Sequence, residues 1–133
     1  MNQKPDASAS AATGRLNLLA IEDSPYDADL VLTELVRAGL NVRMDVAKTA
    51  VEVVAFLLGG AYDVILSDFG LRGWTGLEAL LLVRERRPDI PFILVTGSLG
   101  DEKAAECIKL GAADFVLKDR LHRLPHAITR ALA

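Results

Sequence analysis

The sequence is poor in several residue types and patterns, and each absence narrows the class of protein. It has one cysteine, Cys107, among 133 residues, so it cannot form an internal disulfide. No apolar stretch reaches the roughly 18 residues that a membrane-spanning helix requires, and the first residues lack the basic cluster and apolar segment of a signal peptide. These absences predict a cytoplasmic protein that makes no contact with a membrane.

Positive charge is scarce as well. The chain has 15 lysine and arginine residues and 18 aspartates and glutamates, which gives a net charge of −3 and a pI near 5.3. Nucleic-acid-binding domains normally carry a basic face, so we expect no direct contact with nucleic acid. Hydrophobic residues, by contrast, make up 51% of the chain, which is enough for one domain with a well-buried core.

Two regions differ in composition. Residues 1–14 are rich in alanine and serine, contain Pro5 and show no periodicity, which predicts a flexible N-terminal tail. Residues 15–133 carry a repeated pattern of apolar runs and amphipathic segments. We therefore expect a single folded domain over 15–133.

Four apolar runs and one alternating segment, all of strand length, are separated by helical segments. The apolar runs are residues 18–21, 64–67, 92–95 and 115–117, and residues 42–46 alternate between apolar and charged side chains. Continuous apolar runs indicate strands of a parallel sheet covered on both faces, and right-handed crossovers give a doubly wound α/β fold. The prediction is a flavodoxin-like (βα)5 domain with strand order 2-1-3-4-5, in which residues 42–46 form an edge strand and the switch point lies between strands one and three.

Helix boundaries are marked by capping residues. Ser24 offers an N-cap, followed by Pro25 and by Asp27 three residues after the cap. Two capping boxes follow, Thr49 with Glu52 and Thr75 with Glu78. The last helix is expected to carry apolar residues at helical spacing, with Pro125 in its first turn. These apolar residues are Leu121, Leu124, Ile128 and Leu132.

Polar residues follow four of the expected strands. Glu22 and Asp23 follow the first, Asp68 the third and Lys118 the fifth, and Thr96 ends the fourth. Since the carboxyl ends of parallel strands lie along one edge of a sheet, we expect these side chains to converge. Three neighbouring carboxylates repel one another unless a hard cation such as Mg²⁺ lies among them.

The same residues suit phosphoryl transfer. Asp68 enters a loop directly from its strand, where its carboxylate can attack phosphorus. A metal ion and Lys118 would offset charge on the phosphoryl oxygens, and the Thr96 hydroxyl could hydrogen-bond one of them.

With these residues and Gly76, the chain from residue 16 to 133 resembles the receiver domains of two-component response regulators. The resemblance implies that Asp68 accepts a phosphoryl group from a histidine kinase phosphohistidine, or from a phosphotransfer protein, in the presence of Mg²⁺. It implies that Asp23 binds the metal directly and Glu22 through water.

The resemblance assigns three further roles. The backbone carbonyl of Gly70 completes the protein ligands of the metal, beside the Asp68 carboxylate. Phe115 matches the switch aromatic, which changes rotamer as the Thr96 hydroxyl turns toward the phosphoryl group. The protein would then be a signalling switch that catalyses only its own phosphorylation and slow dephosphorylation, rather than an enzyme with an external substrate.

The chain departs from the family pattern at two positions where proline is common. Arg72 stands four residues after the acceptor, and Asp119 follows the lysine. A cis bond before a residue other than proline costs about 2.5–4 kcal/mol, so we expect a trans Lys118–Asp119 bond and a last helix entered at a different angle. This change would alter the face through which such receivers dimerise or bind partners, and with it any homodimer.

Two features concern the wider protein. The run from Lys118 to Leu121 is similar to a receiver subset found at the N-terminus of longer signalling proteins. The chain ends at Ala133 inside an expected helix, which suggests a domain excised from a longer protein, with a stand-alone receiver as the alternative.

Two other classes of function compete with the receiver hypothesis. An aspartate-nucleophile phosphatase needs a second acid two residues after the nucleophile, where this chain has Gly70. A phosphorylation-independent interaction module would usually have lost the acceptor, the acid pair or the lysine, all of which are present. His122 and His126 are four residues apart, but no third soft ligand accompanies them, so we expect surface histidines.

Overall fold

The computed structural model describes residues 14–97 and 100–133. Apart from Gly14, the predicted N-terminal tail lies outside the described residues. The elements are β1 (Arg15–Ile21), α2 (Pro25–Arg37), β2 (Asn41–Ala47), α3 (Ala50–Gly59), β3 (Val64–Ser67), α4 (Gly76–Arg86), β4 (Phe92–Thr96), α5 (Asp101–Lys109), β5 (Asp114–Leu117), the 3₁₀ segment η1 (Lys118–Arg123) and α6 (Leu124–Leu132).

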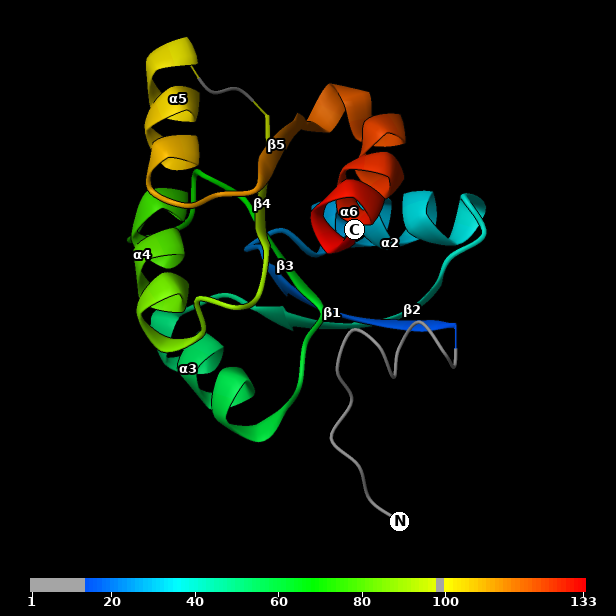
Figure 1. Ribbon diagram of the computed structural model, residues 1–133, viewed down its shortest axis with the longest axis horizontal. Coiled ribbons are helices and arrows are strands. Elements are labelled where there is room, and N and C mark those ends of the chain that lie inside the picture. The colour runs from blue at the N-terminus through cyan, green and yellow to red at the C-terminus, as the bar shows by residue number, and fades with distance from the viewer. Residues whose placement is uncertain (1–13, 98–99) are drawn as a thin grey trace.

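The strands form one five-stranded parallel sheet in the order β2-β1-β3-β4-β5. This order confirms the predicted topology and places β2 at an edge. Helices α3, α4 and α5 cover one face of the sheet, and α2 and α6 cover the other (Figure 1). Because β1 and β3 are neighbours while their connections leave in opposite directions, the switch point falls between them.

The core has two parts, one on each face of the sheet. On one side Leu19, Ile21 and Ile65 pack with residues of α3 and α4. On the other, Leu18 and Leu66 pack with residues of α2 and α6. Successive strand residues point to opposite faces, so the continuous apolar runs supply both halves of the core, as expected for a doubly covered parallel sheet.

The predicted caps are present. The Ser24 hydroxyl accepts a hydrogen bond from the Asp27 backbone N–H. Thr49 with Glu52 and Thr75 with Glu78 form complete reciprocal capping boxes. In the part of the chain that the structure describes, no helix is long and apolar enough to cross a membrane.

The exit from β5 confirms one prediction and corrects another. Among residues 14–97 and 100–133 no peptide bond is cis, so the Lys118–Asp119 bond is trans as expected. The last helix begins only at Leu124, with Pro125 in its first turn. Leu121 was expected on that helix but lies in η1, whose regular geometry breaks at Arg120 (φ −133°, ψ 40°). A 3₁₀ segment of six residues therefore separates β5 from α6, which packs on the sheet.

Candidate functional site

Polar residues that are distant in the sequence meet at the carboxyl edge of the sheet. Glu22 and Asp23 directly follow β1, Asp68 follows β3 and Lys118 follows β5. The backbone holds the first two strand ends together, because the Asp68 N–H donates to the carbonyl of Ile21 at 3.0 Å. The structure thus brings the predicted acid residues and the lysine to the switch point of the fold.

Lys118 is the centre of this site. Its Nζ lies 2.9 Å from Oε1 of Glu22, 2.7 Å from Oδ2 of Asp27 and 3.2 Å from Oδ2 of Asp68. Partial burial alone would lower the pKa of the lysine, but hydrogen bonds to Asp27 and Glu22 and the charges of Glu22 and Asp68 outweigh it and raise that pKa. Lys118 therefore stays charged at any physiological pH.

Asp27 is a site residue that the sequence interpretation missed. It was assigned to the first turn of a helix, and its backbone N–H does bond to the N-cap Ser24. Its carboxylate, however, makes the shortest of the three contacts with Lys118, across 91 positions of sequence. Its position in the sequence could have identified it, because an acid in the first helical turn after Glu22 and Asp23 lies near the same edge of the sheet.

Asp23 points to a different partner. Its Oδ2 accepts a hydrogen bond from the backbone N–H of Arg72, in the loop after the acceptor strand. Within the described ranges, no group of three or more His, Cys, Asp or Glu side chains is arranged to hold a metal ion. Lys118 contacts Glu22 and Asp68, whereas Asp23 accepts from the Arg72 N–H. Of the predicted ligands, Glu22 and Asp68 therefore share the lysine as a cation.

Glu22 is the most buried of these carboxylates, at 7% exposure. Its Oε2 accepts a hydrogen bond from the Ser24 backbone N–H at 3.2 Å. Desolvation raises the pKa of Glu22, and the bonds from Lys118 and Ser24 only partly offset that effect. The ionised form of Glu22 is thus disfavoured in the folded protein relative to the unfolded chain.

This shift predicts how stability depends on pH. A carboxyl group whose pKa is higher in the folded state favours folding most when it is protonated, below its ordinary value of 4.5, and loses that contribution as pH rises through the folded-state pKa. The Glu22→Gln variant lacks this titration. We expect the unfolding free energy of the variant, relative to the unaltered protein, to increase between acidic and neutral pH in urea melts.

The matched control for this measurement is Glu85→Gln, an exposed carboxyl on α4. The rise with pH expected for Glu22→Gln should exceed any change that this control shows. A Glu22→Gln difference that stays flat, or that falls toward neutral pH, would contradict the assignment of a raised pKa to Glu22.

The loop from Asp68 to Thr75 is tightly packed under the site. A Cβ on Gly76 would lie 2.6 Å from the carbonyl oxygen of Asp68 and 2.7 Å from Cα of Phe69. The Gly76 N–H also donates to the carbonyl of Phe69 at 2.7 Å. A side chain at Gly76 would therefore displace the acceptor loop, which gives a physical reason for glycine there.

The remaining predicted residues have the following positions. Thr96 ends β4, is 3% exposed and is paired in register with Leu117, the residue before Lys118. Phe115 is half-buried and packs against the part of the core under α3, α4 and α5. Gly70 forms an isolated antiparallel bridge with Thr75. Thr96 is thus at the carboxyl end of β4, Gly70 is in the loop after Asp68, and Phe115 is on β5.

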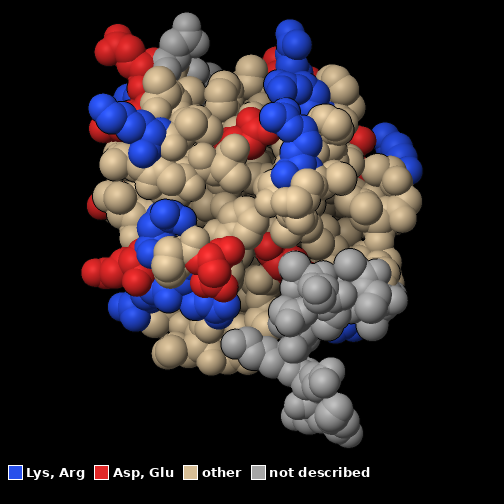
Figure 2. Space-filling model, in the orientation of Figure 1, with Lys and Arg blue, Asp and Glu red and all other residues tan. Residues whose placement is uncertain are grey.

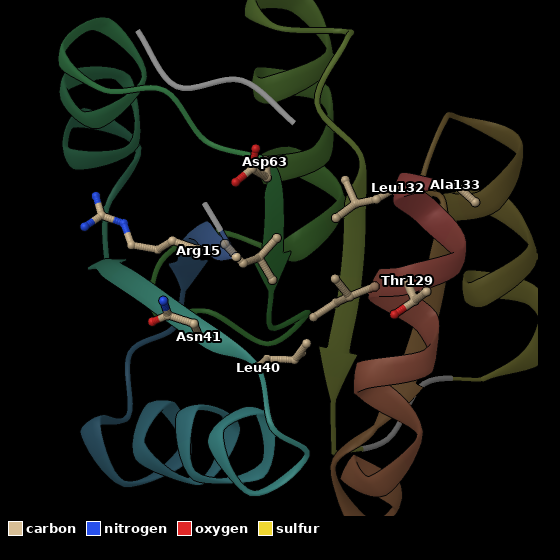
Figure 3. Close-up of a pocket in the computed structure, with 10 residues that line it drawn as sticks. Arg15, Leu40, Asn41, Asp63, Thr129, Leu132 and Ala133 are labelled. Carbon is tan, nitrogen blue, oxygen red and sulfur yellow. The ribbon is translucent and has the colours of Figure 1, made fainter. Parts of the chain in front are cut away.

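A cavity of about 420 Å³ lies away from the site around Lys118. It is lined by the start of β1, the start of β2 and the end of α6, including Arg15, Asn41 and Thr129 (Figure 3). Because β1 runs from Arg15 toward Glu22, this cavity is at the opposite sheet edge from the carboxylates.

Charged residues of both signs are interspersed on the face shown in Figure 2.

Comparison with known proteins identifies the relatives of the chain. The model of the response regulator receiver domain family matches residues 18–129, which confirms the resemblance inferred from the motifs. The chain is 26% identical over 121 residues to the transcriptional regulatory protein ZraR of Salmonella typhimurium, covering 90% of this chain and 27% of ZraR. It is 33% identical over 105 residues to the protein-glutamate methylesterase/protein-glutamine glutaminase of Archaeoglobus fulgidus, covering 77% of this chain and 30% of that protein. The chain thus spans about a third or less of these relatives.

Solved structures confirm the fold. The receiver domain of an HD-domain protein from Pseudomonas fluorescens superposes with a TM-score of 0.78 at 21% identity, covering 89% of this chain and 94% of that one. The response regulator TrrA of Thermotoga maritima, in complex with Mg²⁺ and BeF, superposes with a TM-score of 0.75 at 24% identity, covering 88% of this chain and 99% of that one.

Proposed function

Because the chain belongs to the response regulator receiver domain family, we propose that it is a switch in which Asp68 accepts and later loses a phosphoryl group. The observation that supports this most directly is the contact between Lys118 and Asp68, 3.2 Å apart at the switch point of the sheet. The lysine neutralises charge where a phosphoryl group would add more of it.

The chemistry assigned to Asp68 is nucleophilic. One oxygen, Oδ2, contacts Lys118, and the other oxygen is the one that we assign to attack. It forms an O–P bond as the N–P bond of a phosphohistidine breaks, and the electron pair of that bond stays on the imidazole nitrogen. Lys118 then faces the phosphoryl oxygens, and the Thr96 hydroxyl is assigned to one of them.

Mg²⁺ is the proposed cofactor. The carboxylates of Glu22, Asp23 and Asp68 and the carbonyl of Gly70 are hard oxygen donors, which fit this ion. The metal would supply positive charge beside the transferring group. Lys118 contacts one oxygen of Glu22 and one of Asp68 and would compete with the metal for these carboxylates. The Arg72 N–H, which donates to Asp23, would compete in the same way for that carboxylate.

The bond between Arg72 and Asp23 leads to a prediction with a built-in control. A proline at position 72 has no N–H, so Arg72→Pro frees the Asp23 carboxylate. A hydrogen bond to a charged group contributes about 1.5 kcal/mol, so we expect Mg²⁺ to bind about tenfold more tightly.

Arg72→Ala is the control, because it removes the same side-chain charge but keeps the N–H. Mg²⁺ titrations followed by Trp74 fluorescence, with melting curves to verify folding, measure both variants. Equal affinities in the proline and alanine variants would show that the Arg72 N–H has no influence on the metal.

The proposed partner is a histidine kinase or a phosphotransfer protein, and the chain acts as a switch on a downstream domain or partner rather than on an external substrate. The test is incubation with Mg²⁺ and acetyl phosphate followed by intact mass. A mass increase of one phosphoryl group, lost again on standing, supports the switch. No adduct favours a phosphorylation-independent module, and sustained release of phosphate from added phosphoesters favours a phosphatase.

A further inference from the structure

We propose that Asp27 is a positioning residue of the phosphoryl-transfer site, whose carboxylate holds the Lys118 ammonium beside Asp68 from the first turn of helix α2. This inference rests on the proposed function. It concerns a residue whose place in the sequence suggests a role in helix initiation alone.

The geometry of Lys118 is the first argument. Its contact with Asp27, at 2.7 Å, is shorter than those with Glu22 at 2.9 Å and with Asp68 at 3.2 Å. The lysine side chain is 20% exposed and the Asp27 side chain 29% exposed, so solvent screens the pair only in part. This pair joins the start of α2 to the end of β5, on either side of the acceptor.

The capping pattern of α2 is the second argument. At the other two boxes, the acid three residues after the cap accepts from the N-cap backbone N–H, as Glu52 does at Thr49 and Glu78 at Thr75. At α2 the N–H of the cap Ser24 donates instead to Glu22. The Asp27 carboxylate thus does not close a capping box at α2, and it contacts Lys118 instead.

The count of ammonium protons is the third argument. Lys118 has three N–H donors and three carboxylate partners. Phosphorylation converts the Asp68 carboxylate into an acyl phosphate, so the donor that points to Asp68 can turn to a phosphoryl oxygen. Glu22 belongs to the proposed metal ligands. Asp27 belongs to neither group, so it can keep Nζ within reach of the acceptor throughout the cycle.

The test compares Asp27→Asn with Asp29→Asn, a control that removes an exposed carboxylate two residues away on the same helix. The first readout is the ¹⁵N-detected ammonium resonance of Lys118 without metal or phosphodonor. We expect Asp27→Asn to shift this resonance and to speed its exchange with water. The second readout is the rate of phosphorylation by acetyl phosphate with saturating Mg²⁺, which we expect to fall about tenfold. Asp29→Asn should change neither.

Two further variants separate positioning from a general effect on the fold. Asp27→Glu keeps the charge and should restore much of the rate. In a Lys118→Met background, Asp27→Asn should cause no further loss, because the group that it positions is gone.

The outcomes distinguish this inference from the proposed function. If the unaltered protein acquires no phosphoryl group, the proposed function fails. If the unaltered protein is phosphorylated normally and Asp27→Asn matches Asp29→Asn in both rate and ammonium resonance, only the role of Asp27 fails. A loss of rate in Asp27→Asn that persists unchanged in the Lys118→Met background would also overturn that role.

Discussion

Asp68→Asn is expected to abolish the phosphoryl adduct that the unaltered protein forms with Mg²⁺ and acetyl phosphate. The amide has nearly the same shape as the carboxylate, but it lacks the charge and the nucleophilic oxygen that attack phosphorus. The backbone bond from the Asp68 N–H to Ile21 is unaffected by the change, so the fold should survive. Intact mass after incubation measures the adduct.

The control is Asp119→Asn, an exposed carboxylate next to Lys118 in the chain. It should be phosphorylated like the unaltered protein. Peptide mapping would locate the modified residue in both proteins. An adduct that persists at the same level on Asp68→Asn would move the acceptor to another residue, and mapping would identify it.

The same substitution should alter the charge balance of the site. Lys118 contacts three carboxylates, so negative charge is in excess at the site when no metal is bound. Removing the charge of Asp68 relieves part of this repulsion. The Asp68→Asn variant should therefore be at least as stable as the unaltered protein in melts without Mg²⁺, which separates loss of chemistry from loss of fold.

The fold was predictable because local and global signals agree. Four apolar runs and one alternating segment mark the strands, and the proline after Ser24 and the capping boxes at Thr49 and Thr75 mark the starts of α2, α3 and α4. The error at Leu121 has a local cause. Helical spacing of apolar residues continues through a 3₁₀ turn, so periodicity alone cannot show where η1 ends and α6 begins.

The candidate site was predictable in its residues but not in its contacts. Strand ends fix where Glu22, Asp68 and Lys118 lie, because topology alone brings those backbones together. Topology does not determine which of several nearby acidic side chains the long lysine side chain contacts. Lys118 contacts Asp27 while Glu22 accepts the N–H of Ser24, and these contacts are set by side-chain rotamers that no sequence motif encodes.

Lys118→Met should have the second large effect, on both stability and signalling. It leaves Glu22, Asp27 and Asp68 without their common cation, and the Glu22 and Asp68 side chains are only 8% and 13% exposed. Removing one partner of a buried ion pair costs about 3–5 kcal/mol. Since this site is partly open to solvent, a loss of about 1–3 kcal/mol is expected at neutral pH.

The pH dependence and the metal dependence of that loss identify its cause. Protonation of Glu22 in acid removes its repulsion with the neighbouring carboxylates, so the destabilisation should shrink as pH falls. Mg²⁺ should raise the melting temperature of the variant more than that of the unaltered protein, because no ammonium competes for Glu22 and Asp68. Lys109→Met, which removes an exposed lysine at the end of α5, is the control and should show neither effect.

The lysine variant also tests how phosphorylation is transmitted. With Mg²⁺ and beryllofluoride, NMR signals near Phe115 should shift in the unaltered protein. The Lys118→Met variant should bind the same additive but show much smaller shifts. The physical reason is position: Lys118 directly follows β5, which contains Phe115 and pairs with the end of β4 at Thr96. A lysine drawn toward phosphoryl oxygens pulls on that strand end, and methionine has no charge to be drawn. Shifts at Phe115 that are as large in Lys118→Met as in the unaltered protein would assign transmission to Thr96 alone.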